Sequence, residues 1–388
     1  MSVTAAPGFA AAGVSAGIRP SGKPDVAVVR ALVPAVGSAL WTTNRVQAAP
    51  VTVSRRHLAE AQPQAVVVNA GVANAATGRA GEEDAERTAA HAAAALGLQT
   101  EEVVVLSTGV IGPRLPMEKL LAGVDAAAEA LSADGGDDAA EAILTTDKGP
   151  KTAVVVRDGL TVGGMAKGAG MIHPSLATML AVVTTDYPLP SGAEADRFLR
   201  PAVELTFNRI SVDGDCSTND AVVLLAPRGE PTGGSGREAA FAETLESVCR
   251  DLARQIVADG EGATVVLEIG VSGAASAAEA DAIARRVATS PLVKTAAFGH
   301  DPNWGRVLAA AGSAPWNGGF ADLDPDRLSV SFDGTAVFRS GAPTGLVPEL
   351  GGPACRIDLD LGLGDGEASY LASDLSTDYV RLNAEYTT

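Results

Sequence analysis

The sequence is poor in the residue types that build metal sites and disulfide frameworks. Its 388 residues include three cysteines and four histidines. The cysteines (Cys216, Cys249 and Cys355) lie far apart without metal-ligand spacing, and an odd number does not make a disulfide framework. The histidines are equally dispersed. We therefore expect reduced thiols and no metal site.

Aromatic residues and positive charges are also scarce. Aromatics make up 4% of the chain, so Ala, Val and Leu must build the core that an apolar fraction of 46% allows. Lys and Arg number 29 against 47 Asp and Glu, which gives a formal net charge of −18. Nucleic acids and anionic membranes both select clustered cations, so this composition argues against either as a partner.

Long hydrophobic runs are missing as well. No stretch reaches the ~18 uncharged apolar residues that a membrane-spanning helix requires. The start of the chain, Met1 to Thr4, has no basic region followed by an apolar one, so no signal peptide is predicted. We expect a soluble, cytoplasmic, globular protein without a membrane partner.

Short apolar runs and helix patterns intermix along the chain, which predicts an α/β or α+β fold with layered sheets. Strands are expected at residues 26–29, 65–68, 102–106, 180–183, 221–225, 264–269, 327–332, 355–361 and 378–382. A hairpin is expected to turn at Asp158-Gly159. Helices are expected at residues 82–96, 116–131, 194–207, 238–258 and 277–288. Residues 132–138 are expected to form an acidic surface loop, and the Gly-rich residues 228–237 a linker.

Several short motifs fail on order or context. Residues 13–17 have the spacing of a serine nucleophile elbow, but Pro20 follows where a helix must begin. Residues 163–170 lack the order of a phosphate-binding loop. Residues 213–220 begin like a calcium loop but carry Thr218 where Gly is required. A turn rich in self-capping side chains is the simpler interpretation there.

The Gly-rich block at residues 163–171 is the most unusual part of the sequence, and it leads to Thr178 between Ala177 and Met179. Glycines permit left-handed backbone conformations and close backbone approach. Composition alone favours a tight loop that enters a buried strand, with Thr178 as an ordinary β-branched strand residue. The residues by themselves leave a catalytic role for Thr178 open.

This block resembles the ornithine acetyltransferase (glutamate N-acetyltransferase) family of arginine biosynthesis. The residues that carry the resemblance lie at 167–172 and 177–180, and further similar blocks at 107–112, 145–147, 259–262, 290–295, 301–306 and 382–388. These blocks follow one another in the same order as in the family and extend along nearly the whole chain. One departure is Pro174-Ser175-Leu176, where the family has Pro-Asn-Met or Pro-Asp-Met. Ser175 keeps a small polar group and Leu176 keeps the bulk.

The resemblance implies self-cleavage between Ala177 and Thr178, giving an alpha chain of residues 1–177 and a beta chain of residues 178–388. Thr178 then carries both a hydroxyl nucleophile and a free α-amine, whose reference pKa of ~7.7–8.0 suits a base near neutral pH. Thr108 and Gly109 match the oxyanion hole. The positions that match substrate-binding residues are Thr145, Lys167, Thr178, Glu261, Asn383 and Thr388. We expect Lys167 to face the substrate carboxylate and Glu261 the ornithine ammonium.

The implied fold is a layered αββα sandwich of the kind found in ornithine acetyltransferases and aminopeptidase-like relatives. We expect both fragments to share this sandwich, over about residues 1–227, with a smaller C-terminal lobe over about residues 238–388. The implied reaction moves acetyl from N2-acetyl-L-ornithine to Thr178 and then to L-glutamate, with ping-pong kinetics. No cofactor is implied, although acetyl-CoA stays open as a second donor. The implied partners are amino-acid substrates and the fragments themselves, as a heterotetramer of two alpha and two beta chains.

Three alternatives stay open on the sequence alone. An N-terminal-nucleophile amidohydrolase or aminopeptidase-like enzyme would use water in place of glutamate. A paralogue in a secondary-metabolite pathway would keep the chemistry and change the acceptor. An uncut binding protein would sense an amino acid through the same pocket.

Overall fold

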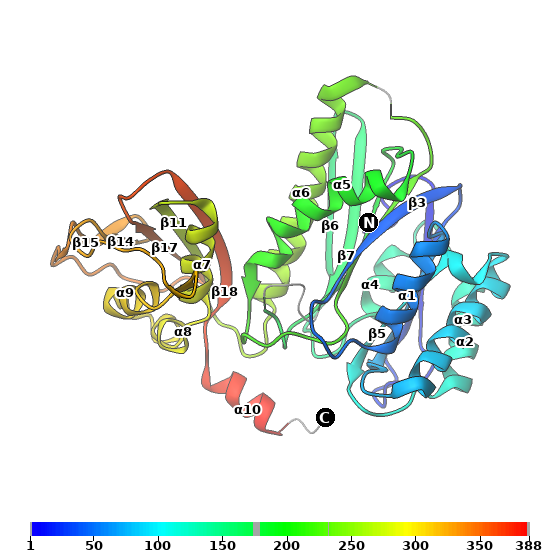
Figure 1. Cartoon of the computed structure of the whole chain (residues 1–388). Coiled ribbons are helices and arrows are strands. Elements are labelled where there is room, and N and C mark those ends of the chain that lie inside the picture. Colours follow the sequence, from blue (N-terminus) through cyan, green and yellow to red (C-terminus); the bar gives the residue numbers. More distant parts are fainter. Residues whose placement is uncertain (1, 174–178, 232, 386–388) are drawn as a thin grey trace. The chain divides into compact units, whose positions relative to one another are not determined.

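The computed structural model describes residues 2–173, 179–231 and 233–385 (Figure 1). Internal contacts divide the chain into two units, and each is described by itself. Among the described residues, the first unit runs to Asn208 and includes Asp215–Ile256, while the second holds Arg209–Gly214 and the chain from Val257 to Glu385. The mixed α/β class with layered sheets is confirmed.

Two sheets form the centre of the first unit. One has the order β1-β2-β4-β5, in which β4 and β5 run parallel. Its strands are β1 (Phe9–Val14), β2 (Val26–Ala31), β4 (Ala65–Val72) and β5 (Val103–Val110). The other has the order β3-β10-β8-β7-β6, in which β10 and β8 run parallel. Its strands are β3 (Ala35–Trp41), β6 (Lys151–Arg157), β7 (Leu160–Lys167), β8 (Leu180–Thr185) and β10 (Ala221–Pro227).

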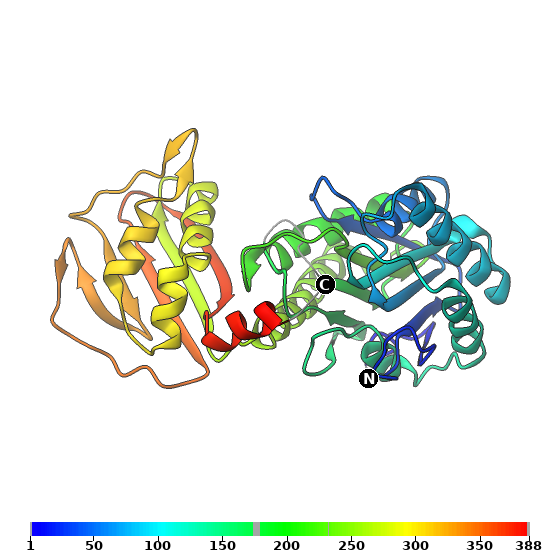
Figure 2. The same cartoon turned by 90° about the horizontal axis from the view of Figure 1, so that it is seen from below.

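Alternating side chains bury both faces of the first sheet. Val66 and Val68 of β4 join the core between the sheets, while Val67 faces the outer helices. Helices α1 (Ala49–Glu60), α2 (Gly78–Leu96) and α3 (Met117–Glu129) pack on that outer side (Figure 2). Helices α5 (Gly192–Glu204) and α6 (Gly234–Ala258) pack on the second sheet. The arrangement is the expected αββα sandwich.

Helix α6 belongs to the first unit, although the sequence analysis placed residues from 238 onward in the C-terminal lobe. Phe241 of α6 stacks on Tyr187 with ring centroids 4.4 Å apart and meets the edge of Phe198 at 4.8 Å. Aromatic pairs of this kind add to the stabilisation from apolar burial. These contacts hold α6 against α5 and the segment that follows β8, so the Gly-rich segment before α6 does not separate the units.

Three local expectations were wrong. Helix α4 (Gly136–Ala142) begins inside the expected loop at 132–138, and Gly135 before it lies so close to β1 that an added Cβ would meet the Ala11 carbonyl oxygen at 1.9 Å. The Gly-rich block begins as strand, since β7 continues through Lys167. Residues 378–382, expected as a strand, lie in helix α10 (Thr377–Glu385).

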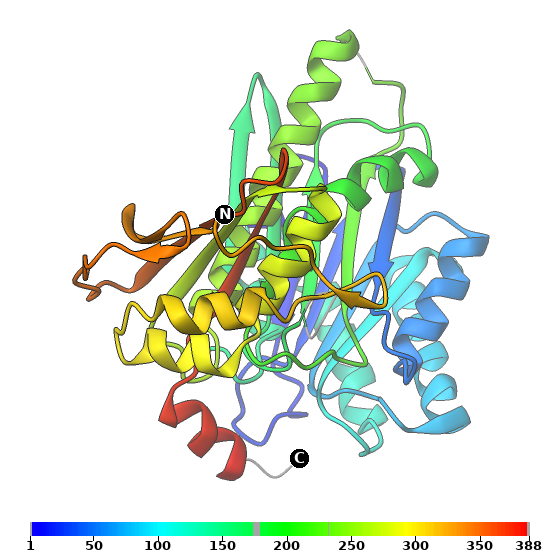
Figure 3. The same ribbon diagram turned by 60° about the vertical axis from the view of Figure 1, so that its left-hand side comes forward.

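The second unit is built on a seven-stranded sheet with the order β16-β15-β14-β17-β11-β18-β9. Its strands are β9 (Ile210–Ser211), β11 (Val266–Ala274), β14 (Ser329–Phe332), β15 (Thr335–Arg339), β16 (Ala342–Pro343), β17 (Ala354–Asp360) and β18 (Gly366–Ser373). Helix α7 (Ala277–Ala288) packs on β11 and β18, and α8 (Pro291–Phe298) lies beside α9 (Trp304–Ala311) (Figure 3). A separate hairpin joins β12 (Pro315–Trp316) and β13 (Gly319–Phe320). In the described part of the chain, no helix has the length and apolar character to cross a membrane.

Candidate active site

The site begins with a buried pair from the two facing sheets. Thr108 lies near the end of β5 and is 4% exposed, and Lys167 ends β7 and is 2% exposed. The Lys167 ammonium donates a hydrogen bond to Thr108 Oγ1 at 3.2 Å. An ammonium group has no lone pair, so the Thr108 oxygen must accept, and its own O–H remains available as a donor. This geometry is compatible with the oxyanion-hole role expected for Thr108.

Gly109 follows Thr108 at a position that only glycine fits. Its φ is +130°, and an added Cβ would lie 2.2 Å from the carbonyl carbon of Gly71. The two glycines face each other where β4 and β5 pair, next to a register shift between Gly71 and Val72. This close approach turns the end of β5 out of regular pairing. The expected oxyanion-hole residues thus share one irregular strand end.

A buried carboxylate organises the segments around Lys167. Asp147 Oδ1 accepts hydrogen bonds from Lys151 Nζ at 2.6 Å and from the Gly168 amide at 2.7 Å, and Oδ2 accepts from the Thr145 amide at 2.9 Å. Burial alone would raise the pKa of Asp147, but the ammonium groups of Lys167 and Lys151 hold that pKa well below its usual range. Asp147 is therefore ionised, and it fixes Thr145 beside the end of β7.

Asp220 is a second buried carboxyl group, and the sequence analysis missed its role. Its Oδ1 accepts a hydrogen bond from the Met179 amide at 2.8 Å, just before β8 begins. Burial raises the pKa of Asp220 well above its usual range, although the hydrogen bond from Met179 and the charge of Lys167 act in the opposite direction. In the sequence, Asp220 stands directly before the strand expected at 221–225, and this position was the available signal. The comparison of residues 213–220 with a calcium loop led to a different interpretation of Asp220.

Asn219 ties the same turn to the first sheet. Its Nδ2 donates to the carbonyl oxygens of Ala73 at 2.6 Å and Ser107 at 2.8 Å. Ser107 precedes Thr108 in β5, and its hydroxyl donates to Asn69 Oδ1 at 2.6 Å. These hydrogen bonds hold the end of β5 against the start of β10, so Thr108 and Asp220 are positioned by one connected network.

Two predicted substrate residues lie together in the second unit. Asn383 Nδ2, on α10, donates to Glu261 Oε2 at 3.0 Å and to the Tyr379 carbonyl oxygen at 3.1 Å. Glu261 is half-buried and Asn383 is exposed. The hydrogen bond holds the Glu261 carboxylate in place while leaving its second oxygen able to accept from a cation.

The family-like block at 290–295 supports this pair through Lys294. The Lys294 ammonium is 3% exposed and donates to the carbonyl oxygen of Ser373. The next residue, Asp374, accepts from the Thr264 amide at 2.8 Å. Ser376 Oγ donates to the Gly262 carbonyl oxygen at 2.7 Å. Lys294 thus anchors the strap between β18 and α10 to α8, while Asp374 and Ser376 bind the strap to the turn that carries Glu261. Burial lowers its pKa to about 8.

Three predicted site residues lie outside the described residues: Ala177, Thr178 and Thr388. The structure brings Thr108, Gly109, Thr145 and Lys167 together in the first unit, and Glu261 and Asn383 together in the second. Within the described part of the chain, no group of three or more His, Cys, Asp and Glu residues could hold a metal ion.

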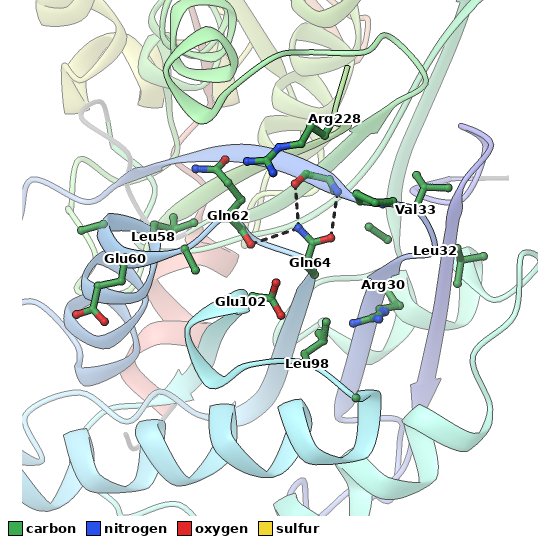
Figure 4. Close-up of a pocket in the computed structure, with 16 residues that line it drawn as sticks. Arg30, Leu32, Val33, Leu58, Glu60, Gln62, Gln64, Leu98, Glu102 and Arg228 are labelled. Carbon is green, nitrogen blue, oxygen red and sulfur yellow. Dashed lines mark hydrogen bonds between the residues drawn. The ribbon is translucent and has the colours of Figure 1, made fainter. Parts of the chain in front are cut away.

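A hollow of about 790 Å³ lies at the other end of the sandwich (Figure 4). Its polar lining includes Arg30, Gln62, Gln64, Glu102 and Arg228. Gln64 closes its floor, donating to the Ala35 carbonyl oxygen at 2.9 Å and accepting from the Ala35 amide at 3.0 Å. Glu102 precedes β5 and Thr108 lies near its end, so roughly 20 Å of strand separates the two. The hollow contains none of the predicted site residues.

The fold and the buried polar cluster define an enzyme of the αββα-sandwich class. Within that class the chain belongs to the ArgJ family, whose sequence model matches residues 10–388. It is 48% identical to the arginine biosynthesis bifunctional protein ArgJ of Thermobifida fusca, over 100% of both chains. It is 50% identical to the protein of the same name from Mycolicibacterium paratuberculosis, over 99% of this chain and 96% of that one.

Solved structures of similar sequence include the ornithine acetyltransferase of Mycobacterium tuberculosis complexed with ornithine. It is 49% identical to this chain, with a TM-score of 0.44, and the match covers 45% of this chain and 96% of that one. The family resemblance drawn from the sequence blocks is confirmed.

Proposed function

We propose that the chain transfers acetyl from N2-acetyl-L-ornithine to L-glutamate through an ester on Thr178. The products are L-ornithine and N-acetyl-L-glutamate. The observation that carries the proposal is identity of 48% along the whole chain to a bifunctional protein of arginine biosynthesis. The polar cluster around Thr108 supports it, because acyl transfer needs fixed donors for a developing oxyanion.

The nucleophile forms by self-cleavage. The Thr178 hydroxyl attacks the carbonyl carbon of Ala177, and the peptide bond breaks as an ester forms. Water opens the ester, which leaves a carboxylate on Ala177 and returns the hydroxyl to Thr178. The new α-amine of Thr178 is the base for later turnovers.

Each turnover has two half-reactions at one site. The Thr178 amine takes the hydroxyl proton as the oxygen attacks the acetyl carbonyl, and it gives a proton to the leaving amine of ornithine. The Thr108 hydroxyl and the Gly109 amide stabilise the oxyanion, and one such donor is worth about 10²–10³ in rate. The α-amine of glutamate then takes the acetyl group from Thr178.

The substrate contacts follow from charge. Lys167 and Thr145 bind the α-carboxylate, Glu261 with Asn383 binds the ornithine side-chain ammonium, and Thr388 is a further substrate contact. Lys167 also orders Thr108, so carboxylate binding and oxyanion stabilisation share one ammonium group. No cofactor takes part in this scheme, and acetyl-CoA is a second donor to be tested.

The proposed mature enzyme keeps its fragments together. Strands from both sides of the junction pair in one sheet: β7 precedes residue 177 and β8 follows it, and the two are antiparallel neighbours. Separating the fragments would break that ladder and expose the core. We place the enzyme in the cytoplasm as a heterotetramer of two alpha and two beta fragments.

The test is an acetyl-transfer assay on purified protein, with N2-acetyl-L-ornithine as donor and with or without L-glutamate. We expect ornithine and N-acetyl-L-glutamate in equal amounts, and two fragments by intact mass. Thr178→Ala should remain one uncut chain without turnover, while Thr178→Ser should cleave and retain part of the activity. Acetate release at the same rate without glutamate would indicate a hydrolase. A single uncut wild-type chain would indicate a binding protein.

A further inference from the structure

The loop between β1 and β2, at residues 15–24, is folded around a buried carboxylate. Asp25 is fully buried, and its two oxygens accept hydrogen bonds from the backbone amides of Ala16 at 2.6 Å, Ile18 at 2.6 Å and Arg19 at 2.8 Å. Ser15 Oγ donates to the Gly22 carbonyl oxygen at 3.0 Å, so the serine of the nucleophile-elbow spacing has a structural task. These hydrogen bonds fix the conformation of the loop from within.

This loop carries Arg19 to the strand ends that hold the candidate site. An added Cβ on Gly71, whose φ is +108°, would lie 3.1 Å from Arg19 Cγ, so the aliphatic part of Arg19 packs on the end of β4. Gly71 pairs with Gly109 of the expected oxyanion hole. The guanidinium donates from Nη1 to the Pro24 carbonyl oxygen and from Nη2 to the Thr145 carbonyl oxygen, both at 3.3 Å. Arg19 therefore lies between the strand end that carries Gly109 and the turn at Thr145.

The Arg19 guanidinium keeps donors for a ligand. It has five N–H groups, and the two carbonyl contacts use two of them. Arg19 is half-buried and forms no ion pair with another described residue. A cation that is held by carbonyl oxygens and not neutralised by a carboxylate favours an anion as its ligand. The planar fork of a guanidinium suits a carboxylate in particular.

A substrate carboxylate beside Thr145 needs such donors. The Thr145 amide and hydroxyl both donate to Asp147 Oδ2, at 2.9 and 3.4 Å. The Lys167 ammonium directs one hydrogen at Thr108 Oγ1, and it also attracts the charge of Asp147. Thr145 and Lys167 are thus already engaged within the cluster. A second carboxylate would meet the negative charge of Asp147 there, and an additional cation offsets that repulsion.

We propose that Arg19 is a further substrate-binding residue, whose guanidinium donates to the α-carboxylate that both substrates share. This inference rests on the proposed function and deepens it. N2-acetyl-L-ornithine and L-glutamate differ in their side chains but carry the same carboxylate next to the reacting nitrogen. Arg19, Thr145 and Lys167 all belong to the first unit, so this group of residues serves both half-reactions. Glu261 is then left to bind the ornithine side chain.

The experiment compares Arg19→Met with wild type in the acetyl-transfer assay. Methionine keeps an apolar stem beside Gly71 and removes the guanidinium. The acceptors are L-glutamate, L-glutamine, which lacks the side-chain carboxylate, and L-isoglutamine, which lacks the α-carboxylate. We expect kcat/KM to fall about 10- to 100-fold for L-glutamate and L-glutamine, and to stay unchanged for L-isoglutamine. Arg19→Lys should give a smaller loss, because an ammonium keeps the charge without the planar fork.

Lys119→Met is the matched control. Lys119 is exposed, and its ammonium donates to the Gly17 carbonyl oxygen at 2.8 Å, so it is a cation that contacts the same loop. This variant should behave as wild type with all three acceptors. An equal loss with L-isoglutamine in Arg19→Met would mean that the substitution disturbs the loop, and it would overturn the inference. A loss confined to L-glutamate would place Arg19 at the side-chain carboxylate and would overturn it as well.

A binding measurement tests the same contact without turnover. Wild type and Arg19→Met are titrated in a calorimeter with L-ornithine and with putrescine, which is ornithine without its carboxylate. We expect the Kd for L-ornithine to rise about 10- to 100-fold in the variant, and the Kd for putrescine to stay the same. If Arg19→Met does not fold, Arg19→Lys should show a smaller rise for L-ornithine alone. Equal affinity of wild type and variant for L-ornithine would contradict the inference. Failure of the proposed function would look different, since wild type would then transfer no acetyl group while its binding of L-ornithine still depended on Arg19.

Discussion

The Lys167 ammonium donates to Thr108 Oγ1 across the two sheets at 3.2 Å, although 59 residues separate them in the chain. The contact fixes which way the Thr108 hydroxyl acts, because its oxygen is occupied as an acceptor and its hydrogen remains to be donated. A hydroxyl at the end of a strand becomes a directed donor only through this neighbour. In the proposed mechanism, Lys167 would therefore serve the oxyanion hole as well as substrate binding.

Removing the Lys167 ammonium should affect catalysis through Thr108. We expect Lys167→Met to lower kcat/KM about 10²–10³-fold, comparable to the loss of one oxyanion donor in Thr108→Val. Because the two groups act as a unit, the double variant should lose little more than either single variant. Steady-state kinetics on all four proteins tests this. Fully additive losses in the double variant would mean that Lys167 acts independently of Thr108.

Gly109→Ala should destabilise the first unit and not only reduce activity. The added Cβ would lie 2.2 Å from the Gly71 carbonyl carbon, and the backbone of one strand must then shift. We expect a loss of about 2–4 kcal/mol in the free energy of unfolding. Gly112→Ala is the control: its φ is +105°, but nothing lies within 4 Å of the added atom. It should cost about 1–3 kcal/mol from strain alone. Urea unfolding of both variants measures the difference, and equal losses would contradict the steric argument.

Asp147→Asn should remove an acid-sensitive contribution to stability. The pKa of Asp147 is lower in the folded chain than in the unfolded chain, so its contribution is fully present above about pH 4. That contribution is lost as the pH falls further and the carboxylate takes up a proton. The variant also leaves Lys151 buried beside a neutral group, which costs about 3–5 kcal/mol. Unfolding measured between pH 3 and 7 should show a weaker acid dependence in the variant. Exposed Asp134→Asn should match wild type.

Local signals in the sequence predicted much of the fold. The turn at Asp158-Gly159 has positive φ at both residues, as a hairpin of this kind requires, and α7 spans the expected residues. Residues 378–382 were misjudged because their alternation imitates a strand. The helix there depends on Ser376, whose hydroxyl accepts from the Tyr379 amide at 3.1 Å. That serine is held by a turn more than one hundred residues earlier, at Gly262, which no local window can detect.

The candidate site was predictable where it consists of contiguous blocks. Thr108, Gly109 and Lys167 stand in such blocks, and the structure places Thr108 and Lys167 in direct contact. Asp220 was not predictable, because its role comes from the parallel pairing of β10 with β8. Pairing of that kind brings the starts of two strands together across about 40 residues, and nothing in the spacing of the sequence records it.

Because of Lys294, the free energy of unfolding of the second unit should increase with pH in the alkaline range. Burial lowers the pKa of its ammonium to about 8 in the folded chain, against about 10.4 for an unfolded lysine. Between these values the unfolded chain binds more protons, so stability rises with pH by up to about 1.4 kcal/mol per unit. Below about pH 8 the ammonium is charged in both states and its full desolvation cost is present.

The variant Lys294→Met should abolish this increase of the free energy of unfolding with pH, while keeping most of the apolar packing of the side chain. Chemical unfolding of wild type and variant between pH 7.5 and 10 tests it, with Lys119→Met as the control, because that exposed lysine donates to the Gly17 carbonyl oxygen. The variant also loses the hydrogen bond to the Ser373 carbonyl oxygen, which anchors the strap that leads to α10. Its KM for N2-acetyl-L-ornithine should therefore rise, with kcat less affected, because Glu261 and Asn383 depend on that strap. If the free energy of unfolding increased equally with pH in wild type and in Lys294→Met, the Lys294 ammonium would not titrate between pH 7.5 and 10.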